Sequence, residues 1–516
     1  MTDFILDRRG VLIGIGTAAA AAGLPVPGFA QTGTPKRGGT LKVSHAQRIA
    51  TLNVLQLSGP AEYLAVDMIY SGLTRMGPNN RPLPDLAESW TADAAAKVHT
   101  FKLRPNLSFH DGSPCTSADV VATFKAILVP ATASPARPVL NMIQDVVAVD
   151  PQTVRFDLNA SYADFPISVA HANARIVSAK ALAGPLTEVD TKANGTGPFK
   201  VESYDSARML RLVKNDKYHE AGKPYLDAVE MYLFPDLAAE SANLLSGAMD
   251  VMLDVQQADF KRIAAARGVN AQRVPSGRFI NVVMRHDQKP FDDVRVRKAL
   301  AMAIDRDLLV DIVLEGLGRP AYDNILSPEY RYRIDTPKIA VNAAGARALL
   351  AQAGHPNGIK IKMIASNRPA IRAQVAIAIK EMVRPAGFDI EVETMPHDTF
   401  LANVWRKGNF YMGYWGMQPT EDGAFTLLMT SDAAFEDSAW FNKEFDALVA
   451  KGRSTLDEAE RAKLYAEAQQ LMLRDTPYII PFFQDVLTAS RDWVKGWNIH
   501  PLSRTFFTET VWIDRG

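Results

Sequence analysis

Short segments in which apolar and polar residues alternate are spread along the whole chain. The alternation at residues 98–103 predicts a strand, and that at residues 389–394 predicts another, with Ile390 and Val392 on one face. Further strands are expected at residues 40–44, 210–213, 229–234 and 478–490. Both halves of the chain therefore contribute strands.

Segments with apolar residues at helical spacing separate these strands. Thr116 is a suitable N-cap, because the carboxylate of Asp119 can accept a hydrogen bond from its backbone amide. Residues 292–293 begin a second helix, whose apolar stripe continues to Val313 and which ends at Gly316. Helices are also expected at residues 343–353, at 371–383 and from 457 onward. This mixture of helices and strands predicts an α/β fold.

The composition excludes several broad classes. A chain of 516 residues is too long for one compact core, so two or three compact units are expected. Lys+Arg and Asp+Glu are both 57, and a zero net charge argues against a nucleic-acid-binding protein. The single cysteine, Cys115, excludes an intramolecular disulfide and any site built from several thiolates. We expect Cys115 to be a small buried residue.

The N-terminal residues have the features of an export signal. Arg8 and Arg9 precede an uncharged run at residues 10–24, and small residues at 28–30 provide a cleavage site. The pair resembles a twin-arginine signal, although Asp7 stands where Ser or Thr is usual, so general secretion also stays open. No cysteine follows the run to carry a lipid. We predict a periplasmic protein that is exported without a lipid anchor.

No catalytic or metal-binding motif emerges from the sequence. His219 and Glu220 are followed by Lys223 where a zinc protease would need a second histidine. His110 and Asp111 have the spacing of a base and the group that orients it, but we interpret them as a hydrogen-bonded turn. The sequence therefore predicts no cofactor and no metal, and nothing in it favours an enzyme.

Several segments, taken in order, resemble one known family. Residues 100–125 (TFKLRPNLSFHDGSPCTSADVVATFK) give the strongest match, and the others are residues 75–90, 195–199 and 295–306. Together they are similar to the periplasmic solute-binding proteins of ABC importers that bind dipeptides, oligopeptides or nickel (solute-binding protein family 5). The similarity extends from about residue 38 to the C-terminus.

The resemblance implies a two-lobed α/β clamshell of the type II periplasmic-binding-protein kind, with an extra α/β subdomain in the first lobe. The predicted domains are a cleaved signal peptide at 1–30, a linker at 31–36, lobe I at 37–69, 196–285 and 490–516, its extra subdomain at 70–195, and lobe II at 286–489.

The resemblance also implies a function. The expected protein is a monomer that captures a peptide or a peptide-sized polar solute by closure of the lobes and passes it to the membrane permease subunits. It binds no nucleic acid and performs no chemistry. One alternative is a non-peptide solute, such as an opine-like amino-acid derivative, a sugar conjugate or a metal chelate. The alternative from another class is a secreted hydrolase.

The loop at residues 414–425 is similar to the family's ligand-binding loop. In peptide binders a Trp is followed three residues later by an Asp that pairs with the amino terminus of the peptide. Trp415 is present here, but the later position is Gln418, a neutral amide that supplies no balancing charge. Either Glu421 or Asp422 compensates, or the solute presents hydroxyl or amide groups to Gln418.

Five further residues complete the predicted ligand-binding site. Trp415 and Tyr414 are expected to form an aromatic wall, and the neighbouring glycines Gly413 and Gly416 allow close approach of the backbone. Arg368 lies near the position at which dipeptide binders hold a carboxylate, and Arg372 is its rival. Ser58 can offer a hydroxyl from the opposite wall.

Overall fold

The computed structural model describes residues 33–506 and 508–515. The chain divides between residues 34 and 35, and every helix and strand given below belongs to the second unit, residues 35–516. The predicted signal peptide at residues 1–30 lies outside the described residues. Within the described ranges, no helix is both long enough and apolar enough to span a membrane.

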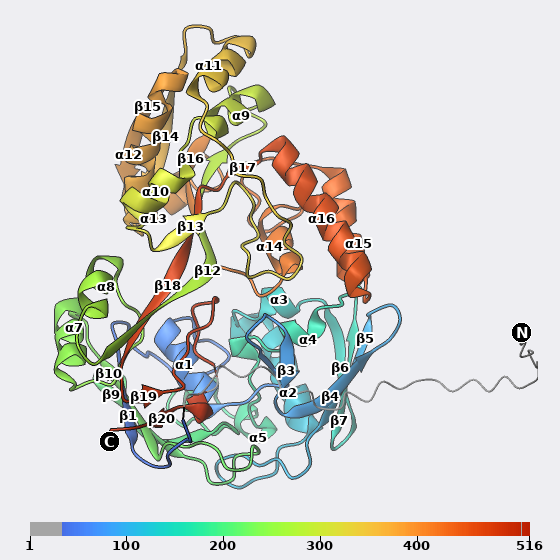
Figure 1. The fold of residues 1–516 in the computed structure, drawn as a ribbon. Helices are drawn as coiled ribbons and strands as arrows, with labels where there is room; N and C mark the ends of the chain where they lie inside the picture. The colour runs from blue at the N-terminus through green and yellow to red at the C-terminus, as the bar shows by residue number, and fades with distance from the viewer. Residues whose placement is uncertain (1–32, 507, 516) are drawn as a thin grey trace, which may run out of the picture. The chain divides into compact units, whose positions relative to one another are not determined.

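A 12-stranded sheet forms the framework of the second unit (Figure 1). Its two central strands, β12 (Val269–Met284) and β18 (Phe482–Arg491), pair in an antiparallel manner. On one side of this pair the order is β16 (Phe410–Trp415), β14 (Ile359–Ser366) and β15 (Phe388–Met395). On the other side it is β11 (Val251–Met252), β1 (Thr40–His45), β10 (Ala228–Leu233), β9 (Met209–Lys214) and β8 (Phe199–Asp205). β13 (Gly318–Pro320) pairs with β18, and β17 (Tyr478–Ile479) pairs with β12.

A separate antiparallel sheet has the order β4 (Ala87–Ala92), β5 (Val98–Leu103), β7 (Thr153–Leu158) and β6 (Ile143–Asp150). Helix α2 (Ser117–Leu128) packs against β6 and β7. The predicted cap is confirmed, since the Thr116 amide donates to the Asp119 carboxylate at 2.8 Å. Cys115 is buried, as expected. This sheet is the extra subdomain of the predicted fold class. Two small sheets pair β2 (Thr74–Met76) with β3 (Pro82–Pro84), and β19 (Val494–Lys495) with β20 (Trp512–Ile513).

Helices cover these sheets. Those nearest the N-terminus are α1 (Pro60–Ile69), α3 (Arg137–Leu140), α4 (Phe165–Ser168), α5 (Ala179–Leu182), α6 (Leu186–Val189), α7 (Leu237–Ser246) and α8 (Gln257–Ala264). Those nearest the C-terminus are α11 (Ala343–Gln352), α12 (Ile371–Val383), α13 (His397–Asn403), α14 (Glu421–Leu428), α15 (Lys443–Ser454) and α16 (Glu458–Asp475). The helices predicted at 343–353 and 371–383 are thus confirmed.

The single helix predicted from residue 292 to 316 is wrong. The segment forms two helices, α9 (Val294–Met302) and α10 (Arg306–Val313). The carboxylate of Asp305 accepts a hydrogen bond from the Leu308 amide at 2.9 Å and so caps a new helix. Both helices bury apolar residues in the same core, which explains why the apolar stripe looked continuous.

The strand predicted at residues 478–490 is interrupted. β17 ends at Ile479 and β18 begins at Phe482. Between them, the amide of Ile480 donates to the Asp323 carboxylate at 3.0 Å, and Pro481 has no amide to donate. A side chain thus replaces the neighbouring strand at this point.

Several hydrophobic cores lie along the framework. One combines β1, β9 and β10 with the separate antiparallel sheet and with α1 and α2. Two others lie among residues 279–483, one beneath α9 to α12 and one beneath α14 to α16. β12 and β18 run between these regions (Figure 1). The predicted domain boundaries stay a prediction.

Candidate functional site

Two cavities lie between segments that are far apart in the sequence. The larger has a volume of about 1290 Å³ and is lined from α8, α10, α12, β12, β16 and β18. The smaller has a volume of about 620 Å³ and is lined from α1, α3, α4, α14, α15 and the segment at residues 502–506. β16 and the loop after it lie between the two, because Tyr414 on β16 lines the larger cavity and Gln418 in the loop lines the smaller one.

Hydrogen bonds hold the wall of the smaller cavity that contains Gln418. The backbone N–H of Gln418 donates to the Tyr330 hydroxyl oxygen at 2.9 Å, which fixes the backbone of the loop. Thr420 then caps α14 by accepting from the Gly423 amide at 2.9 Å. Among the residues that the structure describes, the Gln418 side chain makes one hydrogen bond, a long one of 3.4 Å to the Gly416 carbonyl oxygen. The side-chain amide of Gln418 can therefore exchange this hydrogen bond for one to a solute.

The two acidic residues of the loop are already engaged. Asp422 lines the smaller cavity, is buried, and accepts from Arg453 Nε at 2.9 Å. Burial raises the pKa of Asp422 to about 6, against the opposing charge of Arg453. Glu421 is buried and accepts from the Tyr332 amide at 2.8 Å, and burial raises its pKa as well. Neither carboxylate is a free counter-charge for an ammonium group.

The two aromatic residues of the predicted wall face different ways. Successive residues of a strand point to opposite faces, so Tyr414 and Trp415 at the end of β16 diverge. The Trp415 ring is half-buried beside Trp405 and Phe435, with ring centroids 6.4 Å and 5.5 Å away. Phe435 lines the smaller cavity. Trp415 therefore lies one layer behind this cavity, and the exposed Gly416 follows it.

The remaining predicted site residues line neither cavity. Arg368 is exposed, and Ser58 is exposed with its amide bonded to the Glu62 carboxylate at 2.9 Å. Arg372 is only 7% exposed, and its guanidinium group packs 5.8 Å from the centre of the Tyr414 ring. Burial lowers its pKa to about 10. Among the described residues, Arg372 Nε and Nη1 have no hydrogen-bond partner.

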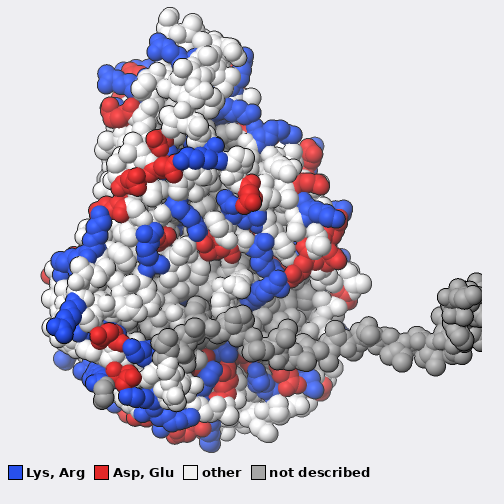
Figure 2. Space-filling model, viewed as in Figure 1, with Lys and Arg blue, Asp and Glu red and all other residues white. Residues whose placement is uncertain are grey.

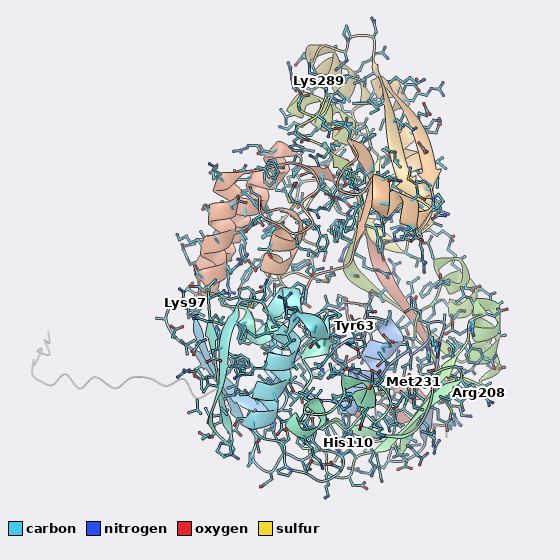
Figure 3. All side chains as sticks on the ribbon, turned by 180° about the vertical axis from the view of Figure 1, so that it is seen from behind. Tyr63, Lys97, His110, Arg208, Met231 and Lys289 are labelled. Carbon is cyan, nitrogen blue, oxygen red and sulfur yellow. The ribbon has the colours of Figure 1, made fainter. Side chains whose placement is uncertain are left out.

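Sequence reasoning missed several residues of the smaller cavity. Tyr63, labelled in Figure 3, lies on α1, and its ring is 5.1 Å from the guanidinium carbon of Arg504. Arg504 also forms an ion pair with Asp67. His171 Nδ1 accepts from the Asn173 amide at 3.1 Å, and burial lowers the pKa of His171 to about 4. These are isolated residues on separate segments, so no local pattern connects them.

The turn at His110 has a structural role. The His110 amide donates to the Gly195 carbonyl at 2.8 Å, and its Nε2 lies 3.1 Å from the Gly197 carbonyl oxygen. It lines neither cavity and lies well away from Tyr63 in Figure 3. In the part of the chain that the structure describes, no cluster of three or more His, Cys, Asp or Glu side chains could hold a metal. Acidic and basic side chains are interspersed on the face shown in Figure 2.

Comparison with known sequences identifies the family. The profile described as "Bacterial extracellular solute-binding proteins, family 5 Middle" matches residues 81–437. The chain belongs to this family. The family consists of non-catalytic solute-binding proteins, so the chain is the substrate-binding component of an ABC importer, with a solute and permease subunits as partners. Family members act outside the cytoplasm, in the periplasm or extracellularly.

Individual members of the family are similar to this chain over nearly its whole length. The glutathione-binding protein GsiB of Escherichia coli (strain K12) is 25% identical over 470 residues, which cover 89% of this chain and 92% of that protein. The structure of AgaA from A. tumefacien R10 in complex with agropinic acid is 26% identical, with a TM-score of 0.74 over 93% of this chain and 99% of that one. CtaP from Listeria monocytogenes has the same fold, with 23% identity and a TM-score of 0.83 over 93% and 100% of the two chains. The predicted fold class is thus confirmed.

Proposed function

We propose that the chain binds a peptide or a peptide-sized polar solute between two lobes, which close on it and pass it on intact. The predicted lobe I, extra subdomain and lobe II keep their bounds in this proposal. The observation that carries it is the smaller cavity, whose wall at residues 417–423 faces walls from α1, α3 and the segment at 502–506. A solute in this cavity touches both predicted lobes, so its binding favours the closed state.

The site residues have distinct roles in this proposal. Gln418 offers a neutral amide, while Tyr414, Trp415 and Gly416 shape the loop that separates the two cavities. Asp422 and Glu421 hold α14 in place through Arg453 and the Tyr332 amide. Arg368 and Arg372 stay candidates for a solute carboxylate, and Ser58 stays a candidate hydroxyl on the opposite wall.

A non-peptide solute such as an opine-like amino-acid derivative is the second candidate. Three observations favour it. Gln418 stands where peptide binders have an aspartate, and both acidic residues of the loop are engaged. The relative bound to agropinic acid is also 26% identical to this chain.

A thermal-shift screen tests the proposal. Peptides, glutathione, opines and sugar conjugates are added separately to the purified protein at pH 7. A solute that binds only the native state stabilises it by roughly 2.7 kcal/mol at a concentration of 100 times its Kd, and this stabilisation raises the Tm. Mass spectrometry must then recover that solute unchanged. No shift with any class contradicts the proposal, and a hydrolysed product supports the alternative of a secreted hydrolase.

We also propose that the protein reaches the periplasm through its N-terminal signal and works there as a monomer. The twin arginines Arg8 and Arg9 and the apolar run at residues 10–24 support export. Replacement of both arginines by lysine, followed by cell fractionation, separates the two routes. Loss of the periplasmic protein indicates twin-arginine export, and an unchanged yield indicates general secretion.

A further inference from the structure

The larger cavity contains two opposite charges that are not paired with each other. Asp254 lies in the segment between β11 and α8, and Arg278 lies on β12, and both line this cavity. The two groups are near enough to interact electrostatically. Within the described ranges, neither takes part in an ion pair. A gap between opposite charges in a cavity is where a ligand with both charges fits.

The carboxylate of Asp254 has neither a hydrogen-bond donor nor an ion-pair partner among the described residues. Its side chain is exposed to the cavity, and in residues 33–506 and 508–515 nothing donates a hydrogen bond to it. Desolvation by the surrounding protein raises the pKa of Asp254, and the charge of Arg278 opposes this effect. The buried Glu240 lies nearby, where burial and then the Asp254 charge raise its pKa to about 7. An arriving cation would relieve this local negative charge.

The guanidinium group of Arg278 is only partly satisfied. Nη2 donates to the Asp485 carbonyl oxygen at 2.8 Å, and among the described residues Nε has no hydrogen-bond partner. The Asp485 carboxylate is held by Arg273, with its Nε at 2.8 Å. Arg278 therefore keeps a positive charge that no neighbouring carboxylate balances in an ion pair.

The other acidic residues of this cavity are already paired. Glu315 forms an ion pair with Lys261 at 2.8 Å, and Glu381 forms one with Arg384 at 4.0 Å. Both pairs are exposed, so they add little to the binding of a solute. This leaves Asp254 and Arg278 as the charges that can select one.

We propose that Asp254 and Arg278 form a subsite for an α-amino acid head group, in which Asp254 binds the ammonium and Arg278 the carboxylate. This proposal rests on the proposed function and specifies its solute class. Gln418 does not supply a counter-charge for the ammonium. In this proposal that counter-charge is Asp254, which lies in the first predicted lobe and lines the larger cavity. The preferred solutes carry an ammonium and a carboxylate on the same carbon, as γ-glutamyl compounds and opine-like derivatives of amino acids do, the latter with a secondary ammonium.

Isothermal titration calorimetry with defined probes tests the subsite. Glutathione and γ-glutamylalanine carry the head group, their N-acetyl derivatives lack the ammonium, and the dipeptide Met-Leu has its two charges separated by a peptide bond. The variants are Asp254→Asn, Asp254→Glu and the control Glu315→Gln, whose carboxylate lines the same cavity but is paired. Asp254 makes no hydrogen bond within the described chain, so its replacement is expected to leave the fold intact.

Asp254→Asn is expected to weaken binding of the γ-glutamyl probes by about 10-fold to 100-fold, since it leaves a desolvated ammonium unpaired. Asp254→Glu should restore part of the affinity. Glu315→Gln should bind the γ-glutamyl probes as the unmodified protein does. N-acetylation of a probe should lower its affinity for the unmodified protein by as much as Asp254→Asn lowers the affinity for the free probe.

Two results would overturn the subsite while the proposed function stands. One is binding of Met-Leu, but of no γ-glutamyl probe, to the unmodified protein. The other is equal affinity of Asp254→Asn and the unmodified protein for glutathione. Failure of every probe to bind the unmodified protein overturns the subsite as well, whereas the proposed function fails only if no class of solute in the thermal-shift screen binds.

Discussion

At the residue scale, the proposed function depends on Gln418, which lines the smaller cavity. Its side chain reaches the cavity from a loop that is fixed by the Tyr330 hydroxyl group, and its bond to the Gly416 carbonyl is long. A primary amide can donate to a carbonyl and accept from a hydroxyl, but it gives an ammonium no balancing charge. The cavity as built therefore favours neutral polar groups at this point.

Gln418→Asp should strengthen binding of dipeptides with a free amino terminus by roughly tenfold, because a charge-assisted hydrogen bond contributes about 1.5–3 kcal/mol, part of which desolvation offsets. Calorimetry with Met-Leu measures this change. Asn159→Asp is a matched control, since it adds a carboxylate elsewhere in the same cavity. Unchanged or weaker binding by Gln418→Asp would remove Gln418 from the site.

Local chemistry accounts for what the sequence predicted at this scale. The bond between Thr116 and Asp119 spans three residues and was predicted correctly. The divergence of Tyr414 and Trp415 follows from strand alternation, so the aromatic wall could have been predicted as two separate faces. Arg453 pairs with Asp422 across 31 residues of sequence, and no local sequence pattern predicts such a partner.

At the element scale, the pair Asp422–Arg453 joins α14 to α15 beside the smaller cavity. Burial raises the pKa of Asp422 to about 6, whereas its ordinary value is 3.8. Between these pH values the folded protein holds a proton that the unfolded chain has released. The contribution of Asp422 to stability therefore decreases as the pH rises from about 4 to about 6.

Asp422→Asn should remove this contribution, because asparagine carries no titrating proton. The Tm of the variant should fall less steeply between about pH 4 and pH 6 than the Tm of the unmodified protein, as measured by differential scanning calorimetry. Asp432→Asn, which changes an exposed carboxylate of the same cavity, should keep the original slope. Parallel curves for Asp422→Asn and the unmodified protein would show that this carboxylate titrates normally.

The elements also show where sequence patterns stop being informative. α11 and α12 have clear caps or stops and were predicted within a residue or two. α9 and α10 share one core, so their combined apolar stripe hid the break that the Asp305 cap imposes. β12 was not predicted, because its 16 residues change from partly exposed to fully buried surroundings along their length.

At the scale of the whole molecule, β12 and β18 are the central strands between separate hydrophobic cores. Both also contribute residues to the larger cavity, and β16 leads from that cavity to the loop of the smaller one. A solute that touches walls from both predicted lobes gains contacts only when those walls approach each other. Its binding energy then shifts the population toward a closed state.

Small-angle X-ray scattering tests this account most directly. The purified protein is measured alone and with a saturating concentration of a solute that raises its Tm and is recovered unchanged. The account predicts a smaller radius of gyration with the solute than without it. The same scattering curve in both states, with binding verified by calorimetry on the same sample, would contradict capture by closure.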